Sequence, residues 1–193
     1  MRKTTLLLNL FLLLSTAIFA QTDVSGTISS DTTWSLENSP YNIVGETSLP
    51  KGVTLTIEPG VVINYMDSYK MFVRGALIAA GTSELPIIWN GAPLEGYNPM
   101  LIYKNNNLSN SIITYNKFYG PQKAIQVGQE TSTSQSNPKN SGTLTVTNSD
   151  FNGANVVTDG YNTTAQLRFE NSTFEDSSIE SYLTEGELVT LSN

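Results

Sequence analysis

A repeated layout near the end of this chain constrains its fold more than any other feature. Two stretches, LTVTNSDF at residues 144–151 and LRFENSTF at residues 167–174, share it: alternating residues, then Asn-Ser, one polar residue and Phe. Asn148 recurs as Asn171 and Phe151 as Phe174, which is a period of 23. A fixed period between about 20 and 50 is typical of solenoids. Each coil needs only two or three short strands and the turns between them, so the repeat predicts stacked coils.

Stacking at about 4.8 Å would place equivalent residues of successive coils above one another. The residues expected to pair and point inward are Leu144 with Leu167, Val146 with Phe169, and Phe151 with Phe174. The residues expected to pair and point outward are Thr145 with Arg168 and Thr147 with Glu170. Asn148 and Asn171 would turn the chain at the end of the strand, because Asn tolerates a left-handed backbone. Their stacked amides would bond to one another.

Two-residue alternation elsewhere predicts further short strands and an all-β fold. In VTLTI, residues 53–57, three aliphatic side chains face one way and two threonines the other, and Pro59-Gly60 then breaks the run. The predicted strands are residues 43–49, 53–57, 61–65, 71–79, 87–89, 100–103, 111–115, 124–127, 144–147, 167–170 and 189–191.

An earlier coil, SIITYNKF at residues 111–118, fits the repeat less well. Alignment of Phe118 with Phe151 places Ile113 at Val146 but leaves Asn116 one position out of register. The spacing of these two phenylalanines is 33 instead of 23. The tract QETSTSQSNPKNSG, residues 129–142, has no apolar residue and explains the surplus. We expect this tract to be a mobile loop.

The last residues, VTLSN at 189–193, repeat the layout of residues 167–171 at a spacing of 22. A solenoid needs a polar cap at each end, and the sequence shows none here. We interpret the chain as truncated from a longer protein. The alternative is that the final coil is an open edge, which would serve self-association or continue into further coils.

Residues 1–20 predict a secretory signal peptide. Arg2 and Lys3 precede the apolar run LLLNLFLLL, and STAIFA follows and ends at Ala20. The apolar run is too short to span a bilayer, so no transmembrane span is expected. Cleavage is expected after Ala20, with Ala17 as the alternative. Residues 21–193 would then be one secreted or cell-surface domain.

Composition excludes several classes of function. The chain contains neither His nor Cys, which removes His-dependent nucleophilic catalysis, the common zinc sites and disulfides. Without residues 1–20 the chain has eight basic and seventeen acidic residues, a formal charge of −9. An acidic protein of this kind is not expected to bind nucleic acid. No cofactor is predicted, and calcium is possible only through carboxylates that form no motif.

Two segments resemble a known family. Residues 34–65 contain Pro50, Gly52, Thr54-Leu55, Ile57 and Pro59-Gly60, and residues 71–91 contain Gly75, Leu77, Ala79, Gly81-Thr82 and Pro86-Ile87. These patterns resemble the N-terminal coils of secreted bacterial right-handed parallel β-helix proteins of the pectate-lyase-like superfamily. The resemblance implies a right-handed parallel β-helix with a capping region near Trp34 and Tyr41. With one coil for each repeat, residues 21–193 would form about seven coils.

Some members of that superfamily are polysaccharide lyases that hold calcium with acidic residues and use Arg or Lys as a base. None of their motifs matches here residue by residue. The best carboxylate cluster from stacking is Asp150, Glu175 and Asp176, with Arg168 and Glu170 as an outward pair. We interpret the first three as turn residues and the pair as a solvated ion pair. A lyase or hydrolase of an acidic glycan is the alternative.

Aromatic residues in the middle coils suggest carbohydrate binding, because exposed rings stack on sugars and neighbouring amides bond to hydroxyl groups. The candidates are Tyr97, Tyr119, Tyr103 and Trp89. Tyr97 and Tyr119 are the expected exposed pair, whereas Trp89 follows Ile87-Ile88 and also fits the core. We therefore expect a non-catalytic β-helix scaffold that binds polysaccharide. Outward threonines also suggest ice binding, but Arg168 and Glu170 interrupt their short rows.

Overall fold

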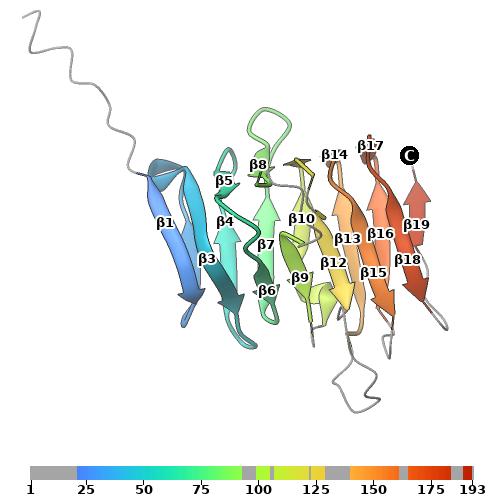
Figure 1. Cartoon of the computed structure of the whole chain (residues 1–193), viewed down its shortest axis with the longest axis horizontal. Helices are drawn as coiled ribbons and strands as arrows, with labels where there is room; N and C mark the ends of the chain where they lie inside the picture. Colours follow the sequence, from blue (N-terminus) through green and yellow to red (C-terminus); the bar gives the residue numbers. More distant parts are fainter. Residues whose placement is uncertain are drawn as a thin grey trace, which may run out of the picture.

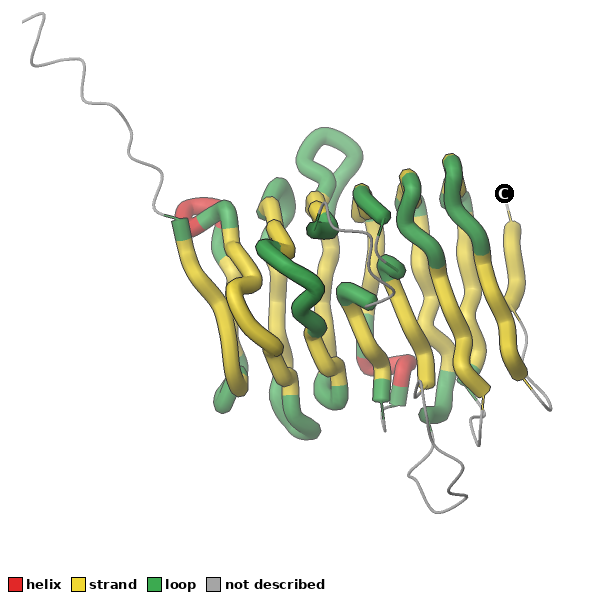
Figure 2. The backbone as a smooth tube through the Cα atoms, viewed as in Figure 1, coloured by secondary structure: helices red, strands yellow, loops and turns green. Residues whose placement is uncertain are grey.

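The chain folds as a parallel β-helix solenoid. In the computed structural model, the residues described are 21–92, 99–104, 107–121, 123–128, 140–160, 165–183 and 189–192. Every paired strand runs parallel to its neighbour, and the strands follow one another along a single axis (Figure 1). The only helical segments in these residues are two short 3-10 turns, η1 (Leu36–Asn38) and η2 (Leu108–Asn110) (Figure 2). The all-β expectation is confirmed.

The solenoid has three faces, each a column of hydrogen-bonded strands. The first face is a separate sheet of β2 (Thr32–Trp34), β4 (Thr54–Ile57), β7 (Ala76–Ala80), β10 (Ile112–Thr114), β13 (Thr143–Thr147), β16 (Gln166–Glu170) and β19 (Val189–Ser192). The second face contains β5 (Val62–Tyr65), β8 (Ile87–Asn90), β11 (Asn116–Tyr119), β14 (Asp150–Asn152) and β17 (Thr173–Glu175). The third contains β6 (Met71–Val73), β9 (Leu101–Tyr103), β12 (Ile125–Gly128), β15 (Val156–Gly160) and β18 (Ile179–Leu183).

One long strand joins the second and third faces. β3 (Tyr41–Leu49) pairs with β5 through residues 41–43 and with β6 through residues 47–49. On its other side β3 pairs with β1 (Thr22–Thr27), which lies at the N-terminal end of both faces. Six coils contain strands on all three faces, and β1 and β19 belong to one further, partial coil at each end. This agrees with the expected number of about seven.

The predicted register is confirmed throughout the repeat. Leu144 pairs with Leu167 and Val146 with Phe169, and the outward pairs Thr145–Arg168 and Thr147–Glu170 are also present. Phe151 pairs with Phe174, and their rings stack with centroids 4.8 Å apart. The stack continues backward through Phe118 to Trp89, at centroid separations of 4.9 and 5.7 Å. A column of four aromatic rings therefore fills the core behind the second face.

Asparagine turns the chain between the first and second faces, as the sequence predicts. Asn148 and Asn171 have φ of 49° and 48°, and the Asn171 amide donates to Asn148 Oδ1 at 3.4 Å. In the coil before them, Tyr115 takes this place with φ of 51°. Asn116 therefore occupies the rung of Ser149, and its backbone N–H donates to Ser149 Oγ at 3.1 Å. Asn116 is one position out of register with Asn148 in the sequence because Tyr115, and not Asn116, is the corner residue of this coil.

Two predictions made from the sequence need correction. Residues 71–79 were expected to form one strand, but β6 and β7 are separate because the chain bends at Gly75. A Cβ at Gly75 would overlap the carbonyl oxygens of Val53 and Pro50, so a side chain cannot occupy this bend. The whole tract 129–142 was expected to be a mobile loop, yet at its end Asn140 is buried and its amide donates to the Tyr103 carbonyl at 2.9 Å. Residues 129–139 lie outside the described part of the chain.

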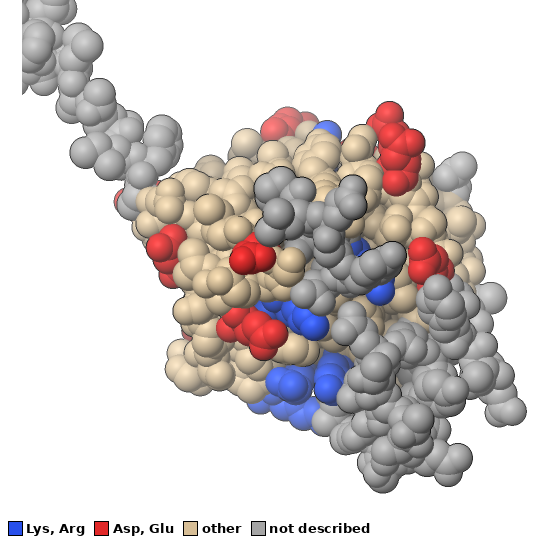
Figure 3. All heavy atoms as spheres, viewed as in Figure 1, with Lys and Arg blue, Asp and Glu red and all other residues tan. Residues whose placement is uncertain are grey.

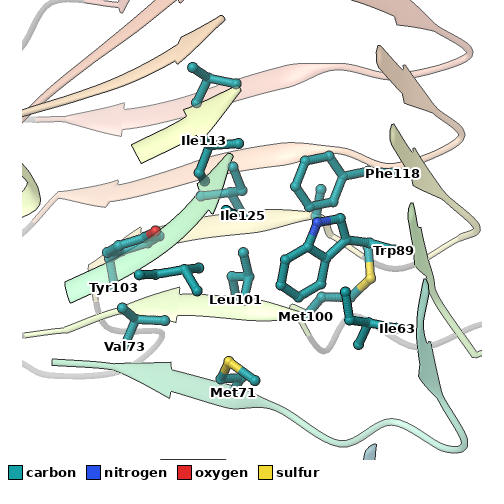
Figure 4. Close-up of a cluster of buried hydrophobic side chains, with 14 of the residues drawn as sticks. Ile63, Met71, Val73, Trp89, Met100, Leu101, Tyr103, Ile113, Phe118 and Ile125 are labelled. Atoms are coloured by element: carbon teal, nitrogen blue, oxygen red, sulfur yellow. The ribbon is translucent and has the colours of Figure 1, made fainter. Parts of the chain in front are cut away.

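The core is continuous along the axis. Figure 4 shows its middle part, where Trp89 and Phe118 stack beside Met100 and Leu101. Near the N-terminal end, Trp34 stacks on Tyr41 at 4.8 Å, and both rings are buried. This is the region that the family resemblance suggests as a cap. The predicted signal peptide, residues 1–20, lies outside the described residues.

Candidate functional site

A column of polar side chains runs along the outside of the second face. The register places Asp23, Asn42, Asn64, Asn90, Tyr119, Asn152 and Glu175 on successive rungs. Asn42, Asn64 and Asn90 form an amide ladder, in which Asn90 donates to Asn64 at 2.9 Å and Asn64 to Asn42 at 3.0 Å. The regular stacking of the coils therefore fixes these amides in one row.

Tyr119 interrupts this row between Asn90 and Asn152. Its side chain is 38% exposed, and no described residue bonds to its hydroxyl group. Asn90 uses one amide hydrogen for the ladder and keeps its Oδ1 free of protein donors among the described residues. Asn152 donates to Glu175 Oε2 at 2.9 Å, and no described residue donates to its own Oδ1. A tyrosine ring therefore lies between two amides that retain hydrogen-bonding capacity.

An ion pair lies beside Tyr119 in the neighbouring outward column. Lys117 Nζ is 3.5 Å from Asp150 Oδ2, and both side chains are well exposed. Thr173 Oγ1 donates to Asp150 Oδ1 at 2.7 Å. Lys117, Asp150 and Thr173 therefore add hydrogen-bond donors and acceptors next to the tyrosine ring. Because the ion pair of Lys117 and Asp150 is exposed, it contributes little to the stability of the fold.

The four aromatic candidates from the sequence do not share one surface. Trp89 and Tyr103 have no exposed area, so their proposed role in stacking on sugars is incompatible with this structure. Both point into the core in Figure 4, and the Trp89 indole N–H donates to Asn116 Oδ1 at 2.7 Å. Burial raises the pKa of Tyr103, as it does that of Tyr65. Tyr97 lies outside the described residues, which leaves Tyr119 as the exposed candidate.

The polar residues considered for catalysis are divided between two faces. Arg168 Nε is 2.6 Å from Glu170 Oε1 on the first face, and both side chains are partly exposed, as a solvated pair requires. Asp150 and Glu175 lie on the second face, and Asp176 follows at a turn with φ of 48°. Across the described residues, no three His, Cys, Asp or Glu side chains are grouped as metal ligands. The structure therefore does not bring these residues into one site.

A basic edge lies on the third face, which is turned toward the viewer in Figure 3. Lys and Arg gather on the lower half of this view. Arg74 follows β6 and Lys104 follows β9, and the Lys104 N–H donates to the Val73 carbonyl of the preceding coil. The Arg74 guanidinium donates to Ser48 Oγ at 3.1 Å and lies 5.5 Å from the Phe72 ring centroid. Two cations therefore follow one another at the same corner of adjacent coils.

The first face contains a hollow that sequence reasoning missed. It arises because β10 begins only at Ile112, and the residues before it form η2 instead of extending the strand. Here serine hydroxyl groups take the place of backbone acceptors between the coils. The Leu77 N–H donates to Ser111 Oγ at 3.1 Å, and the Thr143 N–H donates to Ser109 Oγ at 2.9 Å. The hollow measures about 410 Å³ and is lined by Ser109, Ser111, Ile112, Ile113, Thr143, Thr145 and Thr147.

The row of outward residues beside the hollow is irregular. Its members are Thr33, Thr56, Ile78, Ile112, Thr145, Arg168 and Thr190, with Ile112 placed next to Thr145 by extension of the register. Two isoleucines and an arginine interrupt the threonines. The row therefore lacks the unbroken threonine array that would support ice binding.

Comparisons with known proteins add no relative. No family model, no curated protein and no solved structure matches this chain. Within the described residues, no helix is both long and apolar enough to cross a membrane.

Proposed function

We propose that this protein is a secreted or cell-surface bacterial scaffold of the pectate-lyase-like superfamily that binds polysaccharide without cleaving it. The observation that carries the proposal is the position of Tyr119, an exposed ring between Asn90 and Asn152 on the second face of the β-helix. The N-terminal sequence and the glycine and proline patterns of residues 50–87 support the family, the bacterial origin and export.

The chemistry of this surface suits a sugar chain. A tyrosine ring offers an apolar face on which a pyranose ring can stack, together with a hydroxyl group for hydrogen bonding. The Oδ1 atoms of Asn90 and Asn152 accept from no described residue, so they can accept hydrogen bonds from sugar hydroxyl groups on both sides of the ring. Adjacent rungs are about 4.8 Å apart, so the three side chains form a short linear contact surface. Since the coils hold these side chains in place, little ordering entropy is lost on binding.

Affinity electrophoresis and calorimetry with a panel of neutral and acidic polysaccharides test the proposal. We expect the wild-type protein to bind at least one polymer and Tyr119→Ala to bind it about 10-fold more weakly, as the loss of a stacking contact predicts. Tyr119→Phe keeps the ring and should keep most of the affinity. Leu85→Ala, at an exposed side chain in a turn, is the control and should bind as the wild type does. Failure of the wild type to bind any polymer, or unchanged binding by Tyr119→Ala, would refute the proposal.

A second candidate function is cleavage of an acidic glycan. The basic edge formed by Arg74 and Lys104 favours it, because paired cations bind carboxylate groups of a polyuronate. Incubation with pectate or alginate, with and without calcium, would reveal lyase products by the ultraviolet absorbance of unsaturated ends. Products that disappear in Arg74→Ala or in Arg168→Ala would establish cleavage and overturn the non-catalytic proposal.

A further inference from the structure

The hollow on the first face is the second place where the solenoid departs from a regular surface. It lies beside β10 and β13, whereas Tyr119 belongs to β11 on the second face. We propose that this hollow is a separate binding site for a single neutral sugar unit. The inference does not depend on the role of Tyr119.

Hydroxyl groups supply the polar part of the hollow. Ser109 is exposed and its hydroxyl oxygen accepts a backbone N–H, which leaves its own hydrogen to donate. No described residue bonds to the Thr145 hydroxyl, although the hydroxyl of Thr147 on the same strand donates to Thr114. Ser111 is only 5% exposed and its hydroxyl lies next to that of the buried Tyr103, so Ser109 and Thr145 are the hydroxyl groups open to a ligand. The site thus offers fixed donors and acceptors of the kind that bind sugar hydroxyl groups.

Ile112 supplies the apolar part. Its side chain is 48% exposed and lies next to the threonines of β13 by extension of the register. An apolar wall beside polar groups suits a pyranose, which has an apolar face of C–H groups and a rim of hydroxyl groups. The volume of about 410 Å³ is at the lower end of the range for small-molecule sites, which fits one sugar unit better than a long chain.

The charge of the lining selects among ligands. The chain has 17 acidic and 10 basic residues, yet none of the seven residues that line the hollow is ionisable. Arg168 and Glu170, on the rung after Thr145 and Thr147, are paired with each other at 2.6 Å, so an ionic ligand would lose hydration without gaining an unpaired counter-charge. A neutral polyhydroxyl ligand exchanges hydrogen bonds with water for hydrogen bonds with Ser and Thr. A neutral sugar is therefore the ligand class that matches the site.

Saturation-transfer NMR with methyl glycosides of glucose, galactose, mannose and xylose tests this inference. We expect the wild type to bind at least one glycoside, and Thr145→Val, which removes one hydroxyl with little change in shape, to weaken that binding about 5-fold. Ile112→Ala, which removes the apolar wall, should weaken it as well. Thr56→Val is the matched control on the same face outside the hollow, and it should bind as the wild type does.

Tyr119→Ala separates the hollow from the proposed polysaccharide surface, and it should leave the binding of the methyl glycoside unchanged. The inference is overturned if the wild type binds none of the four glycosides or if both hollow variants bind like the wild type. It is equally overturned if Tyr119→Ala abolishes the signal, because the sugar would then occupy the second face. Loss of binding in either hollow variant, with both Thr56→Val and Tyr119→Ala unaffected, supports it.

Discussion

Removal of one ring from the aromatic column should cost this solenoid more stability than any single surface change. Phe151 has no exposed area, and its ring contacts the rings of Phe118, Phe174 and Phe169 at centroid distances of 4.9, 4.8 and 5.8 Å. Replacement of a buried Phe by Ala costs about 3–5 kcal/mol through lost burial and the cavity left behind. At about 2–4 °C per kcal/mol for a domain of this size, the melting temperature should fall by roughly 6–20 °C.

Phe174→Ala provides a matched control, because it removes the same side chain at the end of the column. Phe174 is only partly buried and contacts two rings, Phe151 and Phe169. We expect a loss of about 1–2 kcal/mol at this position, in proportion to the smaller apolar area that it buries. Both variants replace Phe by Ala, so the difference between their losses of unfolding free energy reports the position within the stack and not the type of residue.

Guanidinium unfolding followed by circular dichroism measures both variants. The far-ultraviolet signal reports the strands, and the near-ultraviolet signal reports the aromatic column that includes Trp89. Equal unfolding slopes would show that stability alone has changed, whereas a lower slope for Phe151→Ala would show that the coils on its two sides unfold separately. If Phe151→Ala destabilises the protein no more than Phe174→Ala, the reasoning from stacked coils is wrong.

Three further predictions follow from individual residues. Asn148→Val should lower the free energy of unfolding by about 1–2 kcal/mol, because a β-branched residue disfavours the φ of 49° at this position. Asn148→Gly should lie within about 0.5 kcal/mol of the wild type, because glycine adopts a positive φ readily. Thermal melts compare the two variants. Asn116→Ala should cost about 2–4 kcal/mol and shift Trp89 emission, because it leaves the indole N–H unpaired and removes the hydrogen bonds to the Ala79 and Thr114 carbonyls. Denaturant titration followed by fluorescence measures both effects. Burial raises the pKa of Tyr65 and Tyr103 above the ordinary value of 10.0, so their neutral form is favoured in the folded state. Their contribution to stability is complete below pH 10 and is lost as the pH rises further, which titration at 295 nm and denaturant midpoints above pH 10 should show.

The interior of the solenoid could be predicted from the sequence because it repeats. The spacing of Phe151 and Phe174 alone specified the register, the inward column and the Asn corner. The strands that were missed are residues 22–27, 32–34, 116–119, 150–152, 156–160, 173–175 and 179–183. Most of them are short or rich in polar residues, so two-residue alternation does not distinguish them from turns. Pairing with neighbouring coils stabilises them, and that pairing is invisible in a local window.

The serine of the repeat shows how such long-range effects escape sequence reasoning. Ser149 is fully buried, donates to the Thr147 carbonyl at 2.8 Å and accepts the Asn116 N–H from the preceding coil. Its backbone N–H in turn donates to Ser172 Oγ in the following coil at 3.3 Å. The motif Asn-Ser therefore combines a turn residue with a hydroxyl group that bridges the backbones of adjacent coils.

The candidate surfaces depended on features that the repeat does not encode. Tyr119 was expected to be exposed, but nothing in the sequence placed it between Asn90 and Asn152, which are distant from it along the chain. Trp89 and Tyr103 belong to the same residue class and yet are buried. On a strand, one residue of shift moves a side chain from outside to inside, so aromatic content alone cannot locate a binding surface.

Both candidate surfaces include residues of one coil that departs from the repeat. Its spacing to the next coil is 33 instead of 23, Tyr115 replaces Asn at its corner, and η2 precedes its first strand. The same coil contributes Tyr119 to the second face and Ile112 to the hollow. A regular coil repeats the outward chemistry of its neighbours, and a ligand is bound selectively only where that chemistry changes. Departures from local rules that the remaining fold tolerates are expected at functional sites. Replacement of this coil by one that follows residues 144–160 should therefore preserve the solenoid and remove both binding activities.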